Sequence, residues 1–503
     1  MSKQFNKFAA LFARKPLDIL LTEAQTDSKL KRALGPFQLI ALGLGAVIGV
    51  GIFVATGSAA NSVAGPSLMI SYVVAGITCI FAALCYAEFA SMVPVAGSAY
   101  TYAYATMGEF FAWIIGWDLL LEYGVASAAV AVGWSSYFKS IVETIGMNIP
   151  QVISESPWRY NTELGQFVNT GSIINLPAAL IIIIITAILI KGITESAAFN
   201  VIMVCIKLAA ILFVIAVGIF LVNSANWKPF APFGWTGVSF FGHNVAGHAG
   251  QGGAPTGMLA GAAIIFFAYI GFDSVSTCTE EAKNPRRDVP IGIVLSLLIC
   301  TVLYVGMTAV LTGMVNYNEL DLNAPVAIAF RQHGLGWAEM IISAAGVAGI
   351  TSVLLVMMLS GPRIFLAMAR DGLVPKGLFG AVHPKFQTPW KSSILIGFFI
   401  LLLASFGPID FLLHLTNMGT LLAFVIVCAA VPVMRYTHPD AKRPFKCPWG
   451  AVIPILGVIT CLMLMFSLPV ENWWRLFTWL GIGVVIYFAY GFRHSELKKY
   501  QKI

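Results

Sequence analysis

The sequence has unusually few charged residues for a chain of its length. Of its 503 residues, 11% are charged and 58% are hydrophobic, whereas soluble domains carry about 25% charged and about 45–50% apolar residues. A surface with so little charge could not be kept in water, so the composition excludes a soluble enzyme, a nucleic-acid-binding protein and a disordered protein. The sequence therefore predicts an integral membrane protein.

Motifs of metal centres, disulfide frameworks and membrane enzymes are also missing. The eight cysteines form no CxxC pair, and neither an HExxH motif nor a phosphate-binding loop occurs. We therefore expect no metal site, no cofactor and no catalytic centre. Seven cysteines lie in apolar runs, which predicts buried free thiols. No repeated filter motif is visible, which disfavours a channel.

Twelve apolar runs are long enough to cross a bilayer. A spanning helix needs about 20 mostly apolar residues, and over such lengths in lipid only helices satisfy their own backbone. We therefore predict an all-α membrane protein with twelve transmembrane helices. These lie near 37–58, 66–92, 98–132, 173–191, 196–222, 256–279, 290–314, 337–362, 391–407, 409–434, 451–469 and 473–492.

The basic residues are distributed unevenly between the two sides of this arrangement. Most of the 30 Lys and Arg residues fall in the two terminal tails and in the loops on the same side. Cytoplasmic loops carry the excess of Lys and Arg in membrane proteins. Both termini are therefore predicted to lie in the cytoplasm, with the chain embedded in the inner (plasma) membrane of the cell.

The order of the runs predicts two repeats. Five spans lie in 37–222 and five more in 256–434, and an odd number of spans inverts the second unit relative to the first. We expect a 5+5 inverted repeat. The remaining segments are a cytoplasmic N-terminal segment (1–36), an extracellular loop (223–255), two extra helices (435–492) and a cytoplasmic tail (493–503).

Two of the spans contain residues that disfavour a helix in mid-membrane. The first contains four glycines between Gly43 and Gly51, each costing about 1 kcal/mol relative to alanine in a helix. The sixth contains Gly271 and the carboxylate Asp273. The small residues could serve helix packing. Alternatively, both helices are interrupted and their free peptide groups bind a substrate, and the matching positions in the two halves favour this interpretation.

Four ionisable residues lie inside spans: Asp118, Glu122, Lys207 and Asp273. Such residues cost about 2.5–3.5 kcal/mol on insertion scales and are candidates for function. Lys207 is either paired permanently with a carboxylate or gains and loses a proton. Glu122 lies one helical turn after Asp118, and it binds an amine, carries a proton or packs as a structural carboxylate. Asp273 either caps the second half of a broken helix or binds a cationic side chain.

A set of short motifs extends over nearly the whole chain. They are Gly49–Phe53, Tyr86–Glu88, Pro94–Tyr100, Glu195–Ala197, Leu259–Asp273, Glu280–Pro285, Val289–Ile293, Pro362–Arg363, Ala367–Leu373 and Thr388–Pro389. The set resembles the cationic amino acid transporters of the amino acid–polyamine–organocation superfamily, in a bacterial-type member. The resemblance implies a secondary active amino acid transporter with a leucine-transporter-like fold.

The resemblance also implies which peptide groups bind the substrate. Its carboxylate is expected on the N–H groups of Gly49, Val50 and Gly51. Its α-amine is expected on backbone carbonyls at both breaks, those of Val47, Ile48, Phe267, Ala268 and Ile270. Phe267 is placed like the aromatic residue that closes over the substrate in relatives.

Lys207 matches the lysine that replaces a sodium ion in proton-coupled relatives. Its ammonium can donate to carbonyls of the first break, and its deprotonation would loosen the first helix. Glu122 is a second candidate for proton coupling. Side-chain specificity is expected from Glu122, Asp273, Thr351 and Ser352.

These expectations combine into a predicted function. The protein is expected to take up an L-amino acid by alternating access, driven by the proton gradient. The substrate would be cationic (arginine, lysine or ornithine) or small and neutral, like alanine. Exchange of amino acids without proton coupling is the alternative. The sequence leaves open whether a small membrane subunit or a second copy of the chain associates.

Overall fold

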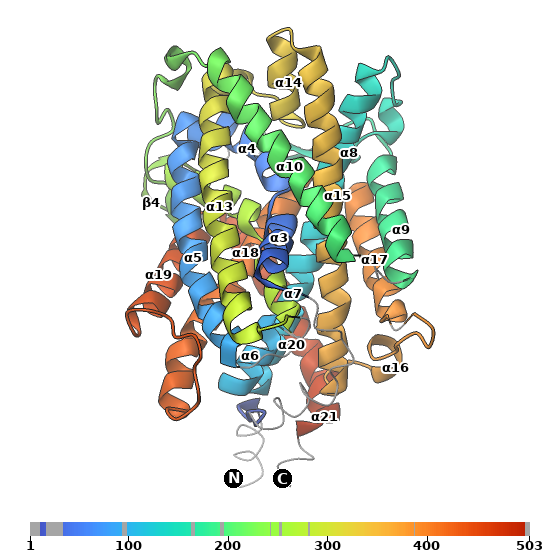
Figure 1. The fold of residues 1–503 in the computed structure, drawn as a ribbon, viewed down its shortest axis with the longest axis vertical. Helices are drawn as coiled ribbons and strands as arrows, with labels where there is room; N and C mark the ends of the chain where they lie inside the picture. Colours follow the sequence, from blue (N-terminus) through green and yellow to red (C-terminus); the bar gives the residue numbers. More distant parts are fainter. Residues whose placement is uncertain are drawn as a thin grey trace.

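The computed structural model describes residues 11–16, 34–92, 98–161, 166–191, 196–241, 243–250, 254–279, 282–386 and 388–497. In this part of the chain the protein is mostly helical, and the long helices run side by side along the long axis (Figure 1). Three short antiparallel strand pairs lie in the connections: β1 (Trp158–Asn161) with β2 (Gln166–Asn169), β3 (Val238–Phe240) with β4 (His243–Ala246), and β5 (His248–Ala249) with β6 (Pro255–Thr256).

The helices follow one another in two groups. The first contains α3 (Pro36–Val47), η1 (Gly51–Ala55), α4 (Thr56–Ala59), η2 (Ala60–Ala64), η3 (Gly65–Ser67), α5 (Leu68–Met92), α6 (Ser98–Thr106), α7 (Glu109–Leu120), η4 (Leu121–Val125), α8 (Ala126–Thr144), α9 (Leu176–Lys191) and α10 (Ser196–Gly218). The second contains α11 (Met258–Ile265), η9 (Phe266–Tyr269), α12 (Ser274–Thr277), α13 (Pro285–Met314), α14 (Pro325–Gln332), α15 (Gly336–Arg370), α16 (Lys376–Phe379), α17 (Trp390–Phe406), α18 (Ile409–Thr437), α19 (Val452–Phe466), α20 (Val470–Ile486) and α21 (Phe492–His494).

Many of these helices have the length and composition of membrane spans. Among the described residues, eight helical segments are long and apolar enough to cross a bilayer, and four shorter apolar helices accompany them. The shorter ones are α3, α9, α17 and α19. The prediction of an α-helical membrane protein is confirmed, while the count of twelve crossings and the inverted repeat stay predictions.

One expected span has the wrong limits. The run 98–132 does not form one helix, because α6 ends at Thr106 and α7 begins at Glu109. Between them Gly108 has a φ of 105°, a conformation that residues with a side chain rarely adopt. A Cβ there would lie 2.6 Å from the backbone of Phe12. The spanning segment is instead Glu109–Thr144.

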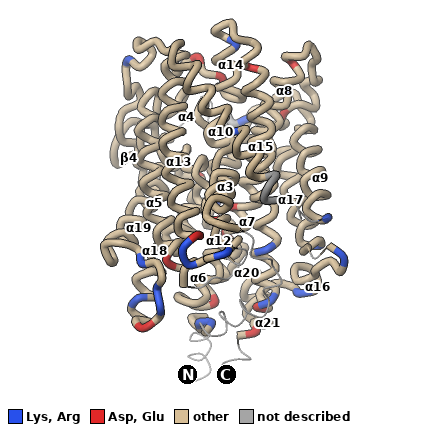
Figure 2. Tube along the Cα trace, viewed as in Figure 1, with Lys and Arg blue, Asp and Glu red and all other residues tan. Residues whose placement is uncertain are grey.

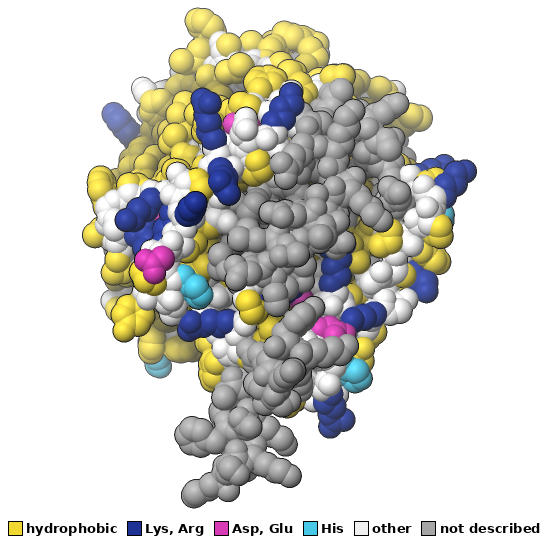
Figure 3. All heavy atoms as spheres, turned by 60° about the horizontal axis from the view of Figure 1, so that its bottom comes forward, with side chains coloured by type: hydrophobic (Ala, Val, Ile, Leu, Met, Phe, Trp, Pro, Cys, Tyr) yellow, Lys and Arg dark blue, Asp and Glu magenta, His cyan; other side chains and the backbone are white. Residues whose placement is uncertain are grey.

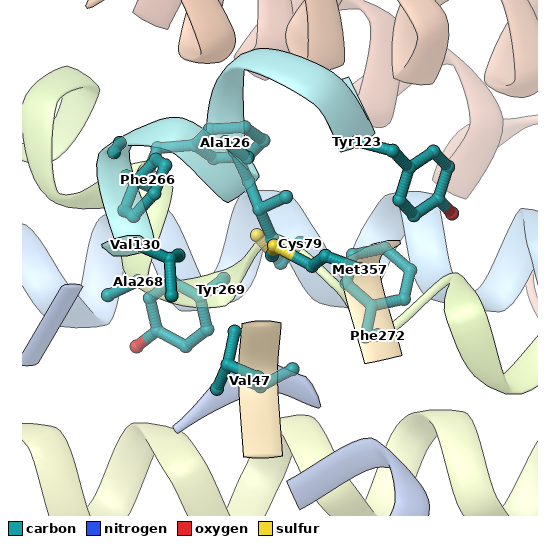
Figure 4. Packing of buried hydrophobic residues seen from close by; sticks show 14 of the residues in the cluster. Val47, Cys79, Tyr123, Ala126, Val130, Phe266, Ala268, Tyr269, Phe272 and Met357 are labelled. Atoms are coloured by element: carbon teal, nitrogen blue, oxygen red, sulfur yellow. The ribbon is translucent and has the colours of Figure 1, made fainter. Parts of the chain in front are cut away.

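Apolar side chains fill the interior and also cover much of the outer surface. Figure 4 shows Val47 of α3 and Ala268 of η9 packed among buried side chains. Its other labelled residues include Cys79 of α5, Val130 of α8 and Met357 of α15. Large apolar side chains are exposed on the outer helices, as expected where lipid replaces water.

The cysteines in the apolar runs are buried as predicted, with one exception. None of the eight, all of which lie in the described part of the chain, forms a disulfide, and seven are buried. The prediction of burial is wrong for Cys205, which is exposed because it shares the outer surface of α10 with Ile202 and Ile206.

Both described ends of the chain meet at one end of the molecule. The ammonium of Lys15 lies 2.8 Å from Asp371 Oδ1, and the N–H of Glu496 donates to the carbonyl of Asp371 at 3.0 Å. Lys and Arg residues are frequent along the chain at this end (Figure 2), and Figure 3 shows their side chains on its surface. This arrangement agrees with the orientation expected from the loop charges, which stays a prediction.

A buried ion pair fastens α5 to α18 near the same end. Glu88 is 2% exposed and accepts hydrogen bonds from Arg435 Nε at 3.0 Å and Nη2 at 2.5 Å. The backbone N–H of Cys447 donates to the same carboxylate at 2.8 Å, and Arg443 Nε lies 3.6 Å away. One carboxylate thus holds a helix end and the loop that follows α18.

Replacing Glu88 with glutamine should destabilise the protein strongly. The substitution leaves the guanidinium of Arg435, whose side chain is 17% exposed, without its counter-charge. Breaking a fully buried pair costs about 3–5 kcal/mol, and the partial exposure of Arg435 places the expected loss toward the lower end. Thermal unfolding in detergent should show a clearly lower melting temperature for Glu88→Gln. The exposed Glu471, in the first turn of α20, is the matched control. Equal melting temperatures for the two variants would contradict the structural role of the pair.

Candidate binding site at two interrupted helices

The first interruption lies within the glycine-rich run of the first predicted span. α3 ends at Val47, Ile48 has an extended backbone (φ −75°, ψ 103°), and helical structure resumes at Gly51. The N–H groups of Gly49, Val50 and Gly51 therefore lie at the start of a new helical segment. The first turn of such a segment leaves N–H groups without intrahelical partners and favours an anion.

The second interruption lies in the sixth predicted span. α11 passes into the short helix η9, which ends at Tyr269, and Ile270 is extended (φ −60°, ψ 138°). Gly271 then has a φ of 110°, and α12 begins at Ser274. The chain thus leaves helical geometry for several residues while it is buried in the protein.

The two interrupted segments are in direct contact. A Cβ added at Gly51 would lie 2.2 Å from the Cα of Ala268, and one at Gly271 would lie 2.9 Å from the carbonyl oxygen of Ala46. Only glycine permits backbones to approach so closely at these positions. The contact places the start of the helical segment after the first break directly against η9, which precedes the second.

Lys207 of α10 is fully buried and reaches the end of α3. Its ammonium donates to the carbonyls of Gly45 at 2.7 Å and Ile48 at 2.9 Å, and it lies 3.5 Å from the carbonyl of Gly349. The contact with carbonyls of the first break is the one expected from the resemblance. Among the described residues, Lys207 makes no ion pair with a carboxylate, so the structure does not favour the permanent pair.

Tyrosine hydroxyls lie on several other carbonyls at the breaks and in the helical segment that follows the first. Tyr304 of α13 lies 3.1 Å from the carbonyl oxygen of Val47 and 3.0 Å from that of Ala268. Tyr137 of α8 donates to the carbonyl of Phe53 at 2.7 Å, and the hydroxyl of Tyr72 lies 3.3 Å from the carbonyl of Gly51. Sequence reasoning missed all three, because a tyrosine within an apolar run carries no signal that distinguishes it from a packing residue.

Three buried carboxylates form a separate group beside the second break. Glu122 lies next to Asp273, whose carboxylate accepts a hydrogen bond from the Tyr123 hydroxyl, and Asp118 faces Gly419 of α18. Five of their six oxygens, all but Asp273 Oδ2, have no hydrogen-bonding partner among the described residues. Carboxylates in such surroundings hold a proton or bind a cationic group.

Asp273 does not cap a helix. It occupies the position before α12, but its side chain makes no capping hydrogen bond. The capping interpretation is therefore not realised in this structure. No group of three or more His, Cys, Asp or Glu side chains is arranged to hold a metal ion within the described ranges.

The residues expected on α15 point in different directions. Ser352 lies against the first break, with its hydroxyl 3.3 Å from the carbonyl of Gly45. Thr351 instead accepts a hydrogen bond from the indole of Trp134 on α8 at 2.9 Å. The neighbour that faces the first break is Val353, 2.8 Å from a Cβ added at Gly49. Phe267 is buried, and its carbonyl accepts from the N–H of Ile270.

A charged pocket of about 270 Å³ lies near the ends of α8, α14 and α18. α14 stands at the opposite end of the molecule from the described chain ends (Figure 1). The ammonium of Lys139 and the carboxylate of Glu155, 3.0 Å apart, lie in its wall, as does Asp410. Val132 also lines it, and the next residue, Gly133, packs against Val50. A residue that lines the pocket is thus adjacent in α8 to one that packs against the first break.

Comparison with known proteins adds an independent observation. Residues 34–488 match the family model described as amino acid permease. The chain is 43% identical to the methylthioribose transporter of Bacillus subtilis (strain 168), over 98% of this chain and 100% of that protein. It is 44% identical to the branched-chain amino acid permease BcaP of the same organism, over 97% and 99%. It is 36% identical to the vacuolar cationic amino acid transporter 4 of Arabidopsis thaliana, over 86% and 68%.

Proposed function

Because this chain belongs to the amino acid permease family, we propose that it imports an L-amino acid by alternating access and binds the substrate backbone at the two interrupted helices. The direct contact between Gly51 and Ala268 carries the proposal. It joins N–H groups suited to a carboxylate to carbonyls suited to an ammonium group. An α-amino acid carries both groups on one carbon atom.

Proton coupling is proposed through Lys207. When its ammonium is charged, it ties the carbonyls of Gly45 and Ile48 together at the end of α3. Loss of the proton would weaken these bonds and shift the balance between conformations of the first helix. Glu122 is the second candidate, because neither of its carboxylate oxygens is paired within the described part of the chain. Exchange without proton coupling remains the alternative.

The substrate is proposed to be a neutral aliphatic amino acid. The relative named branched-chain amino acid permease matches nearly the full length of the chain, and Val353 and Ala268 line the first break with apolar side chains. A cationic amino acid is the second candidate, since the carboxylates of Asp118, Glu122 and Asp273 could receive its side chain.

The arrangement in the membrane forms part of the same proposal. We infer twelve crossings of the plasma membrane, both termini in the cytoplasm, and an inverted relation between the units 37–222 and 256–434. The eight long and four shorter apolar helices support the count. The basic end at which both described chain ends meet supports the orientation.

A ligand screen followed by transport tests the proposal. The melting temperature of the purified protein is measured with each of the twenty L-amino acids and with methylthioribose, which is included because of the relative named for it. We expect aliphatic L-amino acids to raise it and their methyl esters, which lack the carboxylate, to have no effect. In proteoliposomes the stabilising amino acid should show saturable uptake and counterflow. Stabilisation by methylthioribose alone would contradict an amino acid substrate, and equal stabilisation by the esters would contradict binding of the carboxylate.

A further inference from the structure

The hydroxyl of Tyr304 bridges the two interrupted helices. It lies 3.1 Å from the carbonyl oxygen of Val47, the last residue of α3, and 3.0 Å from that of Ala268 in η9. Both oxygens are among those expected to receive the ammonium group of the substrate. The tyrosine therefore occupies hydrogen-bonding positions that a bound substrate would need.

Neighbouring aromatic rings hold the Tyr304 ring in place. The ring of Tyr304 is fully buried and packs edge-on against Tyr72 and tilted against Tyr269, with ring centroids 5.4 Å apart in both cases. The hydroxyl of Tyr269 in turn donates to the carbonyl of Tyr72 at 2.8 Å. α13 itself packs along α5, so the ring lies between the two helices that carry its aromatic neighbours and the second break.

The chemistry of a hydroxyl makes it an incomplete partner for two carbonyls. It has one proton to donate, so at any moment it satisfies Val47 or Ala268 but not both. An ammonium group has three protons and satisfies both at once. A buried acceptor without a donor is unfavourable, so the ammonium is the better partner and should displace the hydroxyl.

We propose that the Tyr304 hydroxyl stands in for the substrate ammonium in the empty protein and thereby allows the carrier to return across the membrane without cargo. The inference rests on the proposed function. Net uptake requires the empty carrier to reorient, whereas exchange requires only the loaded carrier to do so. Without the hydroxyl, the empty carrier would reorient with both carbonyls unpaired by this side chain, whereas in the loaded carrier the substrate ammonium would pair them.

The test compares net uptake with exchange in the variant Tyr304→Phe. Proteoliposomes are given radiolabelled L-leucine, or L-lysine where the native protein does not carry leucine. Net uptake is measured into vesicles without internal substrate, and counterflow into vesicles preloaded with the unlabelled amino acid. With counterflow measured at saturating substrate, we expect the ratio of net uptake to counterflow to fall about tenfold, the effect of about one hydrogen bond. The phenylalanine ring retains its packing against Tyr72 and Tyr269.

Two further variants control this result. Tyr72→Phe also removes a buried hydroxyl, but that hydroxyl contacts Gly51 and Thr56 on the first helix only, so both fluxes should change by the same factor. Incorporation of 4-aminophenylalanine at position 304 supplies two N–H donors. It should preserve net uptake and raise the KM for the labelled amino acid, because the stand-in competes better with the substrate.

The outcomes distinguish the inference from the function on which it rests. A native protein that carries none of the twenty L-amino acids by either flux would overturn both. If Tyr304→Phe lowers net uptake and counterflow equally, or lowers neither, the inference alone is overturned. It is also overturned if Tyr72→Phe lowers net uptake but not counterflow. If Tyr304→Phe does not fold, an unchanged KM with 4-aminophenylalanine would overturn it.

Discussion

Replacing Gly51 with alanine is expected to abolish transport. The added Cβ would lie 2.2 Å from the Cα and 2.4 Å from the Cβ of Ala268, distances that no unstrained contact reaches. Because the nearest atom belongs to the backbone, a change of side-chain rotamer cannot relieve the clash, and the two interrupted segments must separate. Misplacement of a site by about 1 Å can cost about 10²-fold in rate. Initial uptake rates in proteoliposomes, at equal amounts of folded protein, measure the effect.

Two comparisons make this result specific. Gly481→Ala in α20 adds the same methyl group where no atom lies within 4 Å, so transport should stay at the native rate. The double variant Gly51→Ala with Ala268→Gly should not recover activity, because the Cα and N of residue 268 would still lie within 2.8 Å of the new Cβ. Native uptake by Gly51→Ala would show that the contact is not part of the binding site.

Replacing Lys207 with glutamine is expected to abolish accumulation driven by a pH gradient. The side-chain amide of glutamine can donate to carbonyls, as the ammonium does to Gly45 and Ile48, but it neither takes up nor releases a proton. The protein should therefore fold and continue to exchange amino acids, while an outside-acid gradient no longer concentrates them. The measurement is the ratio of internal to external labelled amino acid with and without the gradient.

The controls for Lys207 separate charge from hydrogen bonding. Lys191→Gln changes an exposed lysine at the end of α9 and should leave the accumulation ratio unchanged. Lys207→Met removes every donor, so it should also lower the melting temperature, at about 1–3 kcal/mol for each buried carbonyl left unpaired. If Lys207→Gln still accumulates substrate with the gradient, the coupling group lies elsewhere, and Glu122→Gln becomes the decisive variant.

Sequence reasoning reached the site through residues that are unusual in a membrane helix. Clustered glycines raise the free energy of a helix, and the ionisable Lys207 and Asp273 raise the free energy of insertion into lipid. Such residues are easily recognised within apolar runs. The glycines of the first span, and Gly271 with Asp273 in the sixth, favoured interrupted helices over simple packing, and the structure places the interruptions at Ile48 and Ile270. The resemblance predicted the contact between Lys207 and the first break. The free energy of a residue in a membrane helix depends on that residue and its near neighbours, so it can be judged from a single sequence.

Other residues of the site could not be recognised in this way. Tyr304 lies among apolar residues that are as suited to packing as to binding, and Thr351 and Ser352 are adjacent polar residues that only their helix orientation distinguishes. The prediction of a single span over 98–132 was wrong for a related reason. A single left-handed residue, Gly108, ends a helix without altering the average hydropathy of the run.

The sequence by itself indicated that the protein lies in lipid, that it is helical, and which two spans disfavour a continuous helix. These depend on the free energy of each residue in lipid, which the composition of a short run decides. Only the tertiary structure decided which groups meet at those places. The hydroxyl of Tyr304 reaches a carbonyl 257 positions away in the chain, and such a contact depends on how whole helices pack rather than on any nearby residue.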